Sequence, residues 1–224
     1  MDIAVLMKYV PDTTAKISIS GDRVDESSVS KWSISPFDEY ALEAALAVKE
    51  SSGAKVTAIT CGPARSEKGL RDAAAVGADA LVHIVVEDLI SLDSTKIQGV
   101  LANAIKQIGA NVVFCGKQAA DTNSGSTGPG VAELIGAACV TNAFEISNDG
   151  DTFSVLRPAS SGSERVSVSA PCVVAFDKTS TELRRPNVKG IMMAKKKPID
   201  SMDPDSLGVD VSGSSAVINS QSPP

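Results

Sequence analysis

The residues best suited to ligand chemistry lie in one segment, residues 116–128, which is rich in glycine, serine and threonine. Small side chains let a backbone approach a ligand closely, and hydroxyls with free N–H groups at a helix start form a site for phosphate. Within the segment, Asp121 could accept a hydrogen bond from a ribose hydroxyl or simply cap the turn. The segment matches neither the Walker pattern nor the spaced glycines of dinucleotide-binding loops, so an ordinary surface loop remains an alternative.

Three further loops accompany this segment, at residues 7–12, 34–38 and 61–63. Ligands of doubly wound sheets bind at the carboxyl ends of the strands, where such loops and helix N-termini meet. We therefore expect the four loops to surround one binding site.

Acid–base or nucleophilic catalysis finds little support. The single histidine, His83, lies in an apolar strand-like run, which favours a structural role over that of a general base. The four cysteines, Cys61, Cys115, Cys139 and Cys172, are far apart, so neither a zinc cluster nor a disulfide framework is indicated. We expect them to be reduced and mostly buried. From these residues alone, the chain is an α/β nucleotide-binding protein of open function.

The hydrophobic pattern predicts the strands and helices that position these loops. Strand-length apolar runs at residues 3–7, 56–60, 80–86 and 112–115 alternate with helical periods. Near-continuous apolar strands are typical of a parallel sheet covered on both faces. Ser35 as a capping hydroxyl, Pro36 and Asp38 predict a helix start, and further helices are predicted over 64–76 and from Asp93 to the stop at Gly109.

The pattern changes after residue 145. Residues 147–150 predict a hairpin turn between two antiparallel strands, followed by an alternating segment at 166–169 and a final apolar strand at 172–176. We expect these strands to extend or edge the same sheet. The polar residues 200–224 cannot bury enough surface to fold alone, so we expect them to be disordered or laid across a partner.

Composition excludes several classes of function. The 224 residues carry a formal net charge of −6 and only 4% aromatic residues, which argues against a nucleic-acid-binding face. No run approaches the ~20 apolar residues of a membrane span. Met1 leads directly into an apolar run of strand length rather than a leader, and we expect a cytoplasmic protein.

Five segments, in order and in register, resemble motifs of electron transfer flavoprotein β subunits. They are Ser-Pro-Phe-Asp-Glu-Tyr-Ala-Leu-Glu-Ala-Ala at 35–45, Cys-Gly-Pro at 61–63, Leu70-Arg71 with Gly-Ala-Asp at 77–79, Gly-Lys-Gln-Ala at 116–119 with Asp121, and Ile191-Met192-x-Ala194-Lys195-Lys196-Lys197-Pro198. The resemblance covers about residues 2–218. It implies a doubly wound, mostly parallel sheet related to adenine nucleotide α-hydrolases, with antiparallel edge strands and an extended C-terminal arm.

The resemblance also implies an electron carrier rather than an enzyme. A larger α subunit would hold most contacts to FAD, and this chain would hold a structural AMP. Electrons would come from acyl-CoA or other flavin dehydrogenases and pass to a quinone reductase or another acceptor. By resemblance, the nucleotide-binding residues are Leu6, Ser35, Pro36, Phe37, Asp38, Cys61, Gly116, Lys117, Gln118, Ala119, Ala120, Asp121, Thr122, Asn123, Ser124, Gly125, Ser126 and Thr127.

The family's partner-recognition loop corresponds to about residues 175–199. Val188 stands where the family usually has an anchoring leucine, and Thr13 stands where the family often places an aromatic near the flavin. We divide the chain into a nucleotide-binding α/β domain (1–176), a partner-recognition region (177–199) and an extended tail (200–224). The predicted partner-recognition residues are Arg184, Val188, Ile191, Lys195, Lys196 and Lys197.

Two alternatives stay open. In a bifurcating flavoprotein, a second FAD would replace AMP and NADH would be oxidised nearby, and residues 126–129 are compatible with that branch. A stand-alone adenine-nucleotide sensor would keep the fold and need no partner. The sequence names neither the electron donor nor the acceptor.

Overall fold

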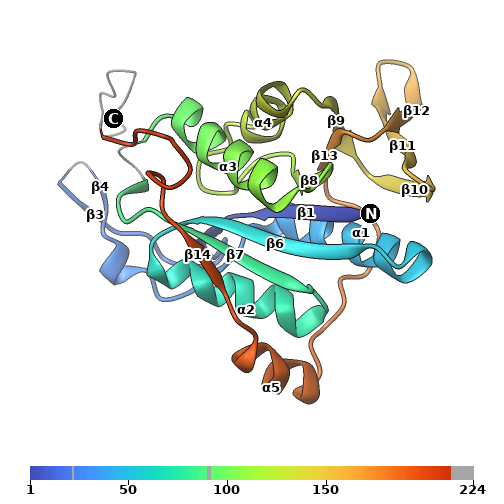
Figure 1. The fold of residues 1–224 in the computed structure, drawn as a ribbon. Helices are drawn as coiled ribbons and strands as arrows, with labels where there is room; N and C mark the ends of the chain where they lie inside the picture. The colour runs from blue at the N-terminus through green and yellow to red at the C-terminus, as the bar shows by residue number, and fades with distance from the viewer. Residues whose placement is uncertain (22, 90–91, 213–224) are drawn as a thin grey trace.

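A seven-stranded parallel sheet forms the centre of the computed structural model, which describes residues 1–21, 23–89 and 92–212 (Figure 1). The strand order is β14-β7-β6-β1-β8-β13-β9, and every neighbouring pair runs parallel. The strands are β1 (Asp2–Met7), β6 (Lys55–Gly62), β7 (Ala80–Val85), β8 (Val112–Gly116), β9 (Ala138–Ala143), β13 (Cys172–Phe176) and β14 (Asp200–Met202). The predicted doubly wound α/β fold is confirmed.

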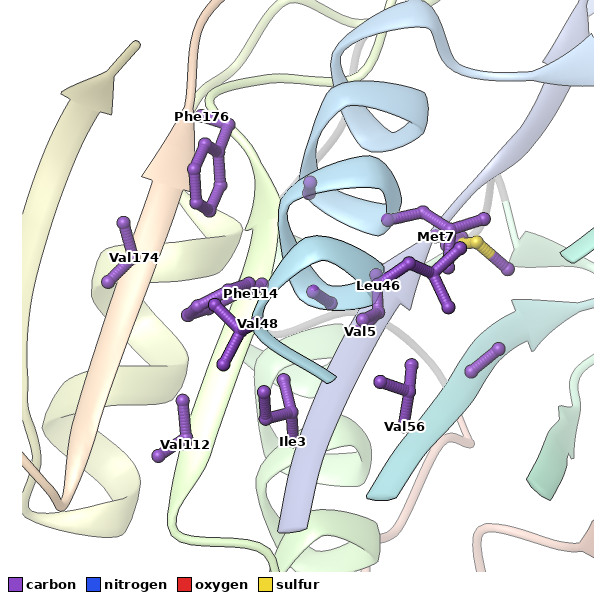
Figure 2. Close-up of a cluster of buried hydrophobic side chains, with 14 of the residues drawn as sticks. Ile3, Val5, Met7, Leu46, Val48, Val56, Val112, Phe114, Val174 and Phe176 are labelled. Carbon is purple, nitrogen blue, oxygen red and sulfur yellow. The ribbon is translucent and has the colours of Figure 1, made fainter. Parts of the chain in front are cut away.

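The central strands form because their apolar side chains are buried on both faces. Ile3, Val5 and Met7 of β1 point into one hydrophobic core with helices α1 and α2, whereas Ala4 and Leu6 point into the other with α3 and α4. Figure 2 shows part of the first core, where Leu46 of α1 lies over Val5. Because both faces of each central strand are buried, the sequence shows short apolar runs in which polar residues do not alternate with apolar ones.

The helices begin and end close to where capping residues predict. They are α1 (Pro36–Ser52), α2 (Glu67–Val76), α3 (Ser94–Ile108), α4 (Thr127–Ile135) and α5 (Val188–Lys196). The Asp93 side chain accepts a hydrogen bond from the Lys96 N–H, and Gly109 ends α3 in the left-handed conformation, at φ +72°. The predicted capping hydroxyl of Ser35 makes no cap hydrogen bond and instead accepts one from Ala120 in the loop after β8.

The antiparallel strands after residue 145 do not extend the main sheet, and that prediction was wrong. β10 (Glu145–Asp149), β11 (Thr152–Ala159) and β12 (Gly162–Ser169) form a separate three-stranded sheet, visible at the right of Figure 1. Phe153 on this sheet is fully buried and meets Phe114 of β8 edge to face, with ring centroids 5.9 Å apart. Alternating residues give the small sheet one apolar face, so it covers the core instead of continuing the sheet.

The strand predicted at 172–176 is β13, and it joins the main sheet as expected, in a place between β8 and β9. It is not the final strand of the chain, because β14 follows it.

Part of the C-terminal arm folds back onto its own chain. β14 pairs in parallel with β7, and Leu207, only 6% exposed, packs into the core beside α3. The side chains of Asn103 and Lys96 on α3 donate hydrogen bonds to the carbonyls of Leu207 and Asp210. The expectation of a disordered or partner-bound arm was therefore wrong up to residue 212, because β7 offers a free sheet edge. Residues 213–224 lie outside the described part.

Short elements before α1 had no counterpart in the sequence prediction. β2 (Tyr9–Pro11) pairs antiparallel with β5 (Trp32–Ile34), and β3 (Ile19–Ser20) pairs with β4 (Arg23–Val24). A 3-10 turn at Glu26–Ser28 completes this region, and a second one, Ala64–Ser66, directly precedes α2 within the helix predicted over 64–76. In the described parts of the chain, no helix has the length and apolar character to cross a membrane.

Candidate functional site

A cavity of about 470 Å³ opens at the carboxyl ends of β1, β6 and β8. The chain winds from β1 towards β6 on one side of the sheet and later to β8 on the other, so β1 and β8 flank the point where the winding reverses. Doubly wound proteins bind ligands at this switch point, and the cavity volume suits a small organic ligand. Of the residues predicted by resemblance, those lining the cavity are Leu6, Asp38, Cys61, Gly116, Lys117, Gln118, Ala119, Asp121, Thr122, Ser124, Gly125 and Thr127.

The remaining predicted residues support the cavity without lining it: Ser35, Pro36, Phe37, Ala120, Asn123 and Ser126. Ser35 is fully buried, and its hydroxyl accepts a 3.2 Å hydrogen bond from the Ala120 N–H instead of capping α1. The Asn123 side-chain oxygen accepts from the Gln118 amide at 2.8 Å. These contacts shape the loop that follows β8. Ligand contacts by all eighteen residues remain predictions.

Asp38, in the first turn of α1, joins two of the loops. Its Oδ2 accepts a 2.8 Å hydrogen bond from the Lys8 N–H, and its Oδ1 accepts one of 2.8 Å from the Gly116 N–H. The side chain is almost completely buried, and this burial raises its pKa to about 7. The carboxylate predicted for the helix start therefore serves the strand-end loops rather than the helix.

The loop from Gly116 into α4 has the features of a ligand cradle. Gly125 adopts φ +66°, a conformation that glycine tolerates best. The Ser126 hydroxyl, between the cavity-lining residues Gly125 and Thr127, is buried and has no hydrogen-bond partner among the described residues, so its hydrogen-bonding capacity is unused. The first N–H groups of α4 lack intrahelical acceptors, as at every helix start. The residues present thus fit an anionic group of a nucleotide.

Two lysines supply positive charge at the cavity. Lys8 Nζ lies 2.6 Å from Asp121, and Lys117 Nζ lies 2.9 Å from Asp177 and 5.0 Å from the centre of the Phe37 ring. Both are about one-quarter exposed, so each could exchange its carboxylate for a ligand phosphate.

Sequence reasoning missed an aromatic and cationic cluster at the cavity. Tyr9 and Trp32 stack with centroids 6.3 Å apart, and the Arg65 guanidinium lies 4.3 Å from the Trp32 ring centre and 2.7 Å from Glu26. The nearest atom that a Cβ on Gly69 would meet belongs to Tyr9, at 3.1 Å. The pairing of β2 with β5 brings the two rings together, and no local sequence signal predicted that pairing.

The predicted partner-recognition residues divide into two groups. Val188, Ile191, Lys195 and Lys196 lie on α5, where Val188 is 75% exposed. Arg184 instead pairs with Glu43 at 2.7 Å and Glu50 at 2.8 Å, both on α1.

Lys197 likewise makes contacts within its own chain, because it donates hydrogen bonds to the carbonyls of Ala78 and Asp79 beyond the end of α2. Arg71 of α2 donates to the carbonyls of Ala194 and Lys197. These contacts fix α5 against α2, as Figure 1 shows. Methionines 192 and 193, both more than 60% exposed, extend the apolar surface of α5 beyond the predicted residues.

His83 and the cysteines have structural surroundings. His83 is 1% exposed, and its Nε2 lies 2.9 Å from the Gly62 carbonyl. Burial raises the pKa of Cys61 to about 12 and that of Cys172 to about 11, which keeps both thiols protonated. Cys115 is also buried, whereas Cys139 is exposed. No group of three or more metal-ligating side chains occurs in the described ranges.

The doubly wound sheet and its switch-point cavity thus define an α/β protein with a cavity suited in size to a small ligand. The family model "Electron transfer flavoprotein domain" matches residues 25–207. The chain is 35% identical to the electron transfer flavoprotein subunit beta of Bacillus subtilis over 94% of this chain and 82% of that protein. The human protein of the same name is 34% identical, over 99% of this chain and 89% of its own length.

A relative with a different name, the acryloyl-CoA reductase electron transfer subunit gamma of Anaerotignum propionicum, is 32% identical over 92% of this chain and 79% of its own length. The chain belongs to the electron transfer flavoprotein family. It is an electron transfer subunit of the β type and not an enzyme, as the resemblance implied.

Proposed function

We propose that the cavity binds AMP and that the chain works as a heterodimer with an α subunit, which holds most contacts to FAD. Several features of the cavity support an adenylate. The apolar side chains of Leu92, Ile97 and Leu101 line one part, suited to a base. The unpaired Ser126 hydroxyl and the start of α4 suit a phosphate. The observation that carries the proposal is the switch-point cavity, lined by the expected strand-end loops together with Lys8 and Lys117.

FAD, when bound, supplies the redox chemistry, and AMP has a structural role. Residues of this chain orient and enclose the ligands. The exposed apolar surface of α5 would receive the electron donor, an acyl-CoA or other flavin dehydrogenase, and a quinone reductase or similar protein would accept the electrons. The relative named as an electron transfer subunit of acryloyl-CoA reductase supports a donor or acceptor of the acyl-CoA oxidoreductase class.

The test is to purify the chain with its co-expressed α subunit, denature the complex and measure the released nucleotides. One FAD and one AMP per heterodimer are expected. A complex that releases no AMP, or a chain that forms no complex with the α subunit, would contradict the proposal.

A second candidate, the bifurcating flavoprotein, is favoured by one observation. The cavity continues past the predicted adenylate residues to Tyr9, Trp32 and Arg65, which leaves room for a larger ligand. Two FAD per heterodimer, with no AMP, would support this candidate and exclude the first. Oxidation of NADH by the complex would then be the expected second result.

We also propose a cytoplasmic, reducing location. Cys61, Cys115, Cys139 and Cys172 are all free thiols. Disulfides are rare in such compartments. Fractionation of the native host, with the flavin absorbance followed in each fraction, tests this location.

A further inference from the structure

Asp38 occupies a special place in the cavity. It belongs to α1, but its two carboxylate oxygens accept from the N–H groups of Lys8, just after β1, and Gly116, at the end of β8. β1 and β8 are adjacent strands on either side of the switch point. One buried carboxylate therefore bridges the two strand ends between which the ligand is expected.

The residues next to Asp38 allow this close approach of the two strand ends. A Cβ on Gly116 would lie 2.5 Å from Asp38 Oδ1 and 2.7 Å from Phe37 Cβ, so only glycine lets the strand end come this close. Ser35, directly before α1, accepts from the Ala120 N–H. The start of α1 thus holds three N–H groups, from Lys8 after β1, from Gly116 at the end of β8 and from the loop that follows β8.

At a pH near 7, the protonated and the ionised forms of Asp38 have similar free energies. Burial raises the pKa of Asp38 to about 7, against the opposing effects of the two N–H groups and of Lys8. The charged groups nearby are Lys8 and Asp121, paired with each other, and Lys117, paired with Asp177. The Cys115 thiol is buried, and burial raises its pKa further from neutrality.

We propose that Asp38 is a positioning residue whose carboxylate holds the loops after β1 and β8 in their nucleotide-binding shape, and that protonation releases one of them. An ionised carboxylate accepts strongly from both N–H groups, whereas the hydroxyl oxygen of a protonated one is a weaker acceptor whose own O–H must turn away from the N–H donor. This inference rests on the proposed nucleotide site and adds a proton-linked control to it.

The test compares AMP affinity of the wild-type heterodimer and its Asp38→Asn variant, after removal of bound nucleotide, from about pH 5.5 to about pH 8.5. Asparagine mimics the protonated acid, since its NH₂ group faces one of the N–H donors. The ratio of the variant Kd to the wild-type Kd should be on the order of tenfold at the alkaline end, because one charge-assisted hydrogen bond is lost. At the acidic end the ratio should fall towards one, and ionisation of the AMP phosphate cancels in the ratio.

Ser35→Ala is the matched control, because it removes an acceptor for the same loop without a titrating group. Its Kd ratio to wild type should not change with pH. Amide exchange of the peptides containing Lys8 and Gly116 gives a second measurement on the wild type alone, should the asparagine variant fail to assemble. Their protection, corrected for intrinsic exchange, should fall as the pH is lowered through about 7.

A Kd ratio for Asp38→Asn that is constant across the pH range, or amide protection that ignores pH, would overturn the inference while leaving AMP binding intact. Failure of the wild type to bind AMP at every pH would overturn the proposed function and this inference together.

Discussion

At the scale of single residues, Gly116 is constrained by the neighbours of its missing side chain. A Cβ there would overlap with Asp38 and Phe37, and the backbone N of Asp38 would lie only 2.8 Å away. We expect Gly116→Ala to destabilise the fold by about 1–3 kcal/mol, because the backbone must shift. Denaturant unfolding measures the change. Gly99→Ala, inside α3 with its nearest neighbour atom at 3.7 Å, should be neutral or slightly stabilising. Equal losses for both variants would refute the steric explanation.

Asp38 also predicts a pH dependence of stability. Its folded-state pKa is about 7, raised by burial above the ordinary value of 3.8. A carboxyl with a raised pKa favours folding most in its protonated form. Its contribution is therefore complete below the unfolded value and is lost as the pH rises through about 7.

The unfolding free energy of wild type minus that of Asp38→Asn should accordingly decrease between about pH 4 and pH 7. Urea unfolding of the two proteins across this range measures the difference. A difference that is flat with pH would show that the buried carboxylate costs the fold nothing.

At the scale of elements, helix α5 presents an apolar surface that the described parts of the chain leave uncovered. By the resemblance, Val188 stands where the family usually has a leucine, which carries one methylene more. We therefore expect Val188→Leu to strengthen dehydrogenase binding by up to about 0.8 kcal/mol, roughly fourfold in Kd. Val188→Asp should weaken it several-fold without changing the flavin content. Titration of the heterodimer with its dehydrogenase measures both.

Leu134→Asp on α4, where Leu134 is 43% exposed, is the control and should bind like wild type. Loss of binding in the control alone would move the docking surface to α4.

Elements could be predicted from the sequence where the hydrophobic periodicity and a capping residue determine them. The strand runs and the Asp93 and Gly109 boundaries of α3 belong to this group. Prediction failed where tertiary pairing decides. The place of β13 between β8 and β9, the separate sheet of β10–β12 and the return of β14 to β7 depend on which edge is free, and no local pattern records that.

In the candidate binding site, too, some features could be predicted from local sequence and others depend on tertiary contacts. Strand-end loops could be predicted because parallel strands place their carboxyl ends together. The roles of Ser35 and Asp38 could not, because a serine followed three residues later by a carboxylate looks like an ordinary helix cap. The contribution of Tyr9, Trp32 and Arg65 depends on β2 meeting β5, two strands of three residues each.

At the scale of the whole molecule, exposed apolar side chains gather in two places. One is α5, and the other is the β3–β4 ribbon with Ile17, Ile19 and Val24, whose end reaches the cavity through Val24. If this chain shares FAD with a larger subunit, as proposed above, that subunit is expected to cover apolar surface near the cavity. We expect the ribbon to gain amide protection on heterodimer formation, and α5 to gain it only when the dehydrogenase is added.

Hydrogen exchange of the isolated chain, the heterodimer and the ternary complex tests this order. The β11–β12 hairpin, distant from both surfaces in Figure 1, is the internal reference and should not change. Protection of α5 already in the heterodimer would reverse the assignment of the two surfaces.

Trp32, which lines the cavity, is the only tryptophan among the 224 residues. Its ring stacks with the Tyr9 ring and lies 4.3 Å from the positively charged Arg65 guanidinium. Fluorescence excited selectively in tryptophan therefore reports from one point of this chain, beside the ligand. A nucleotide titration of the subunit needs no attached dye, since quenching or a spectral shift of that one emitter follows occupancy directly.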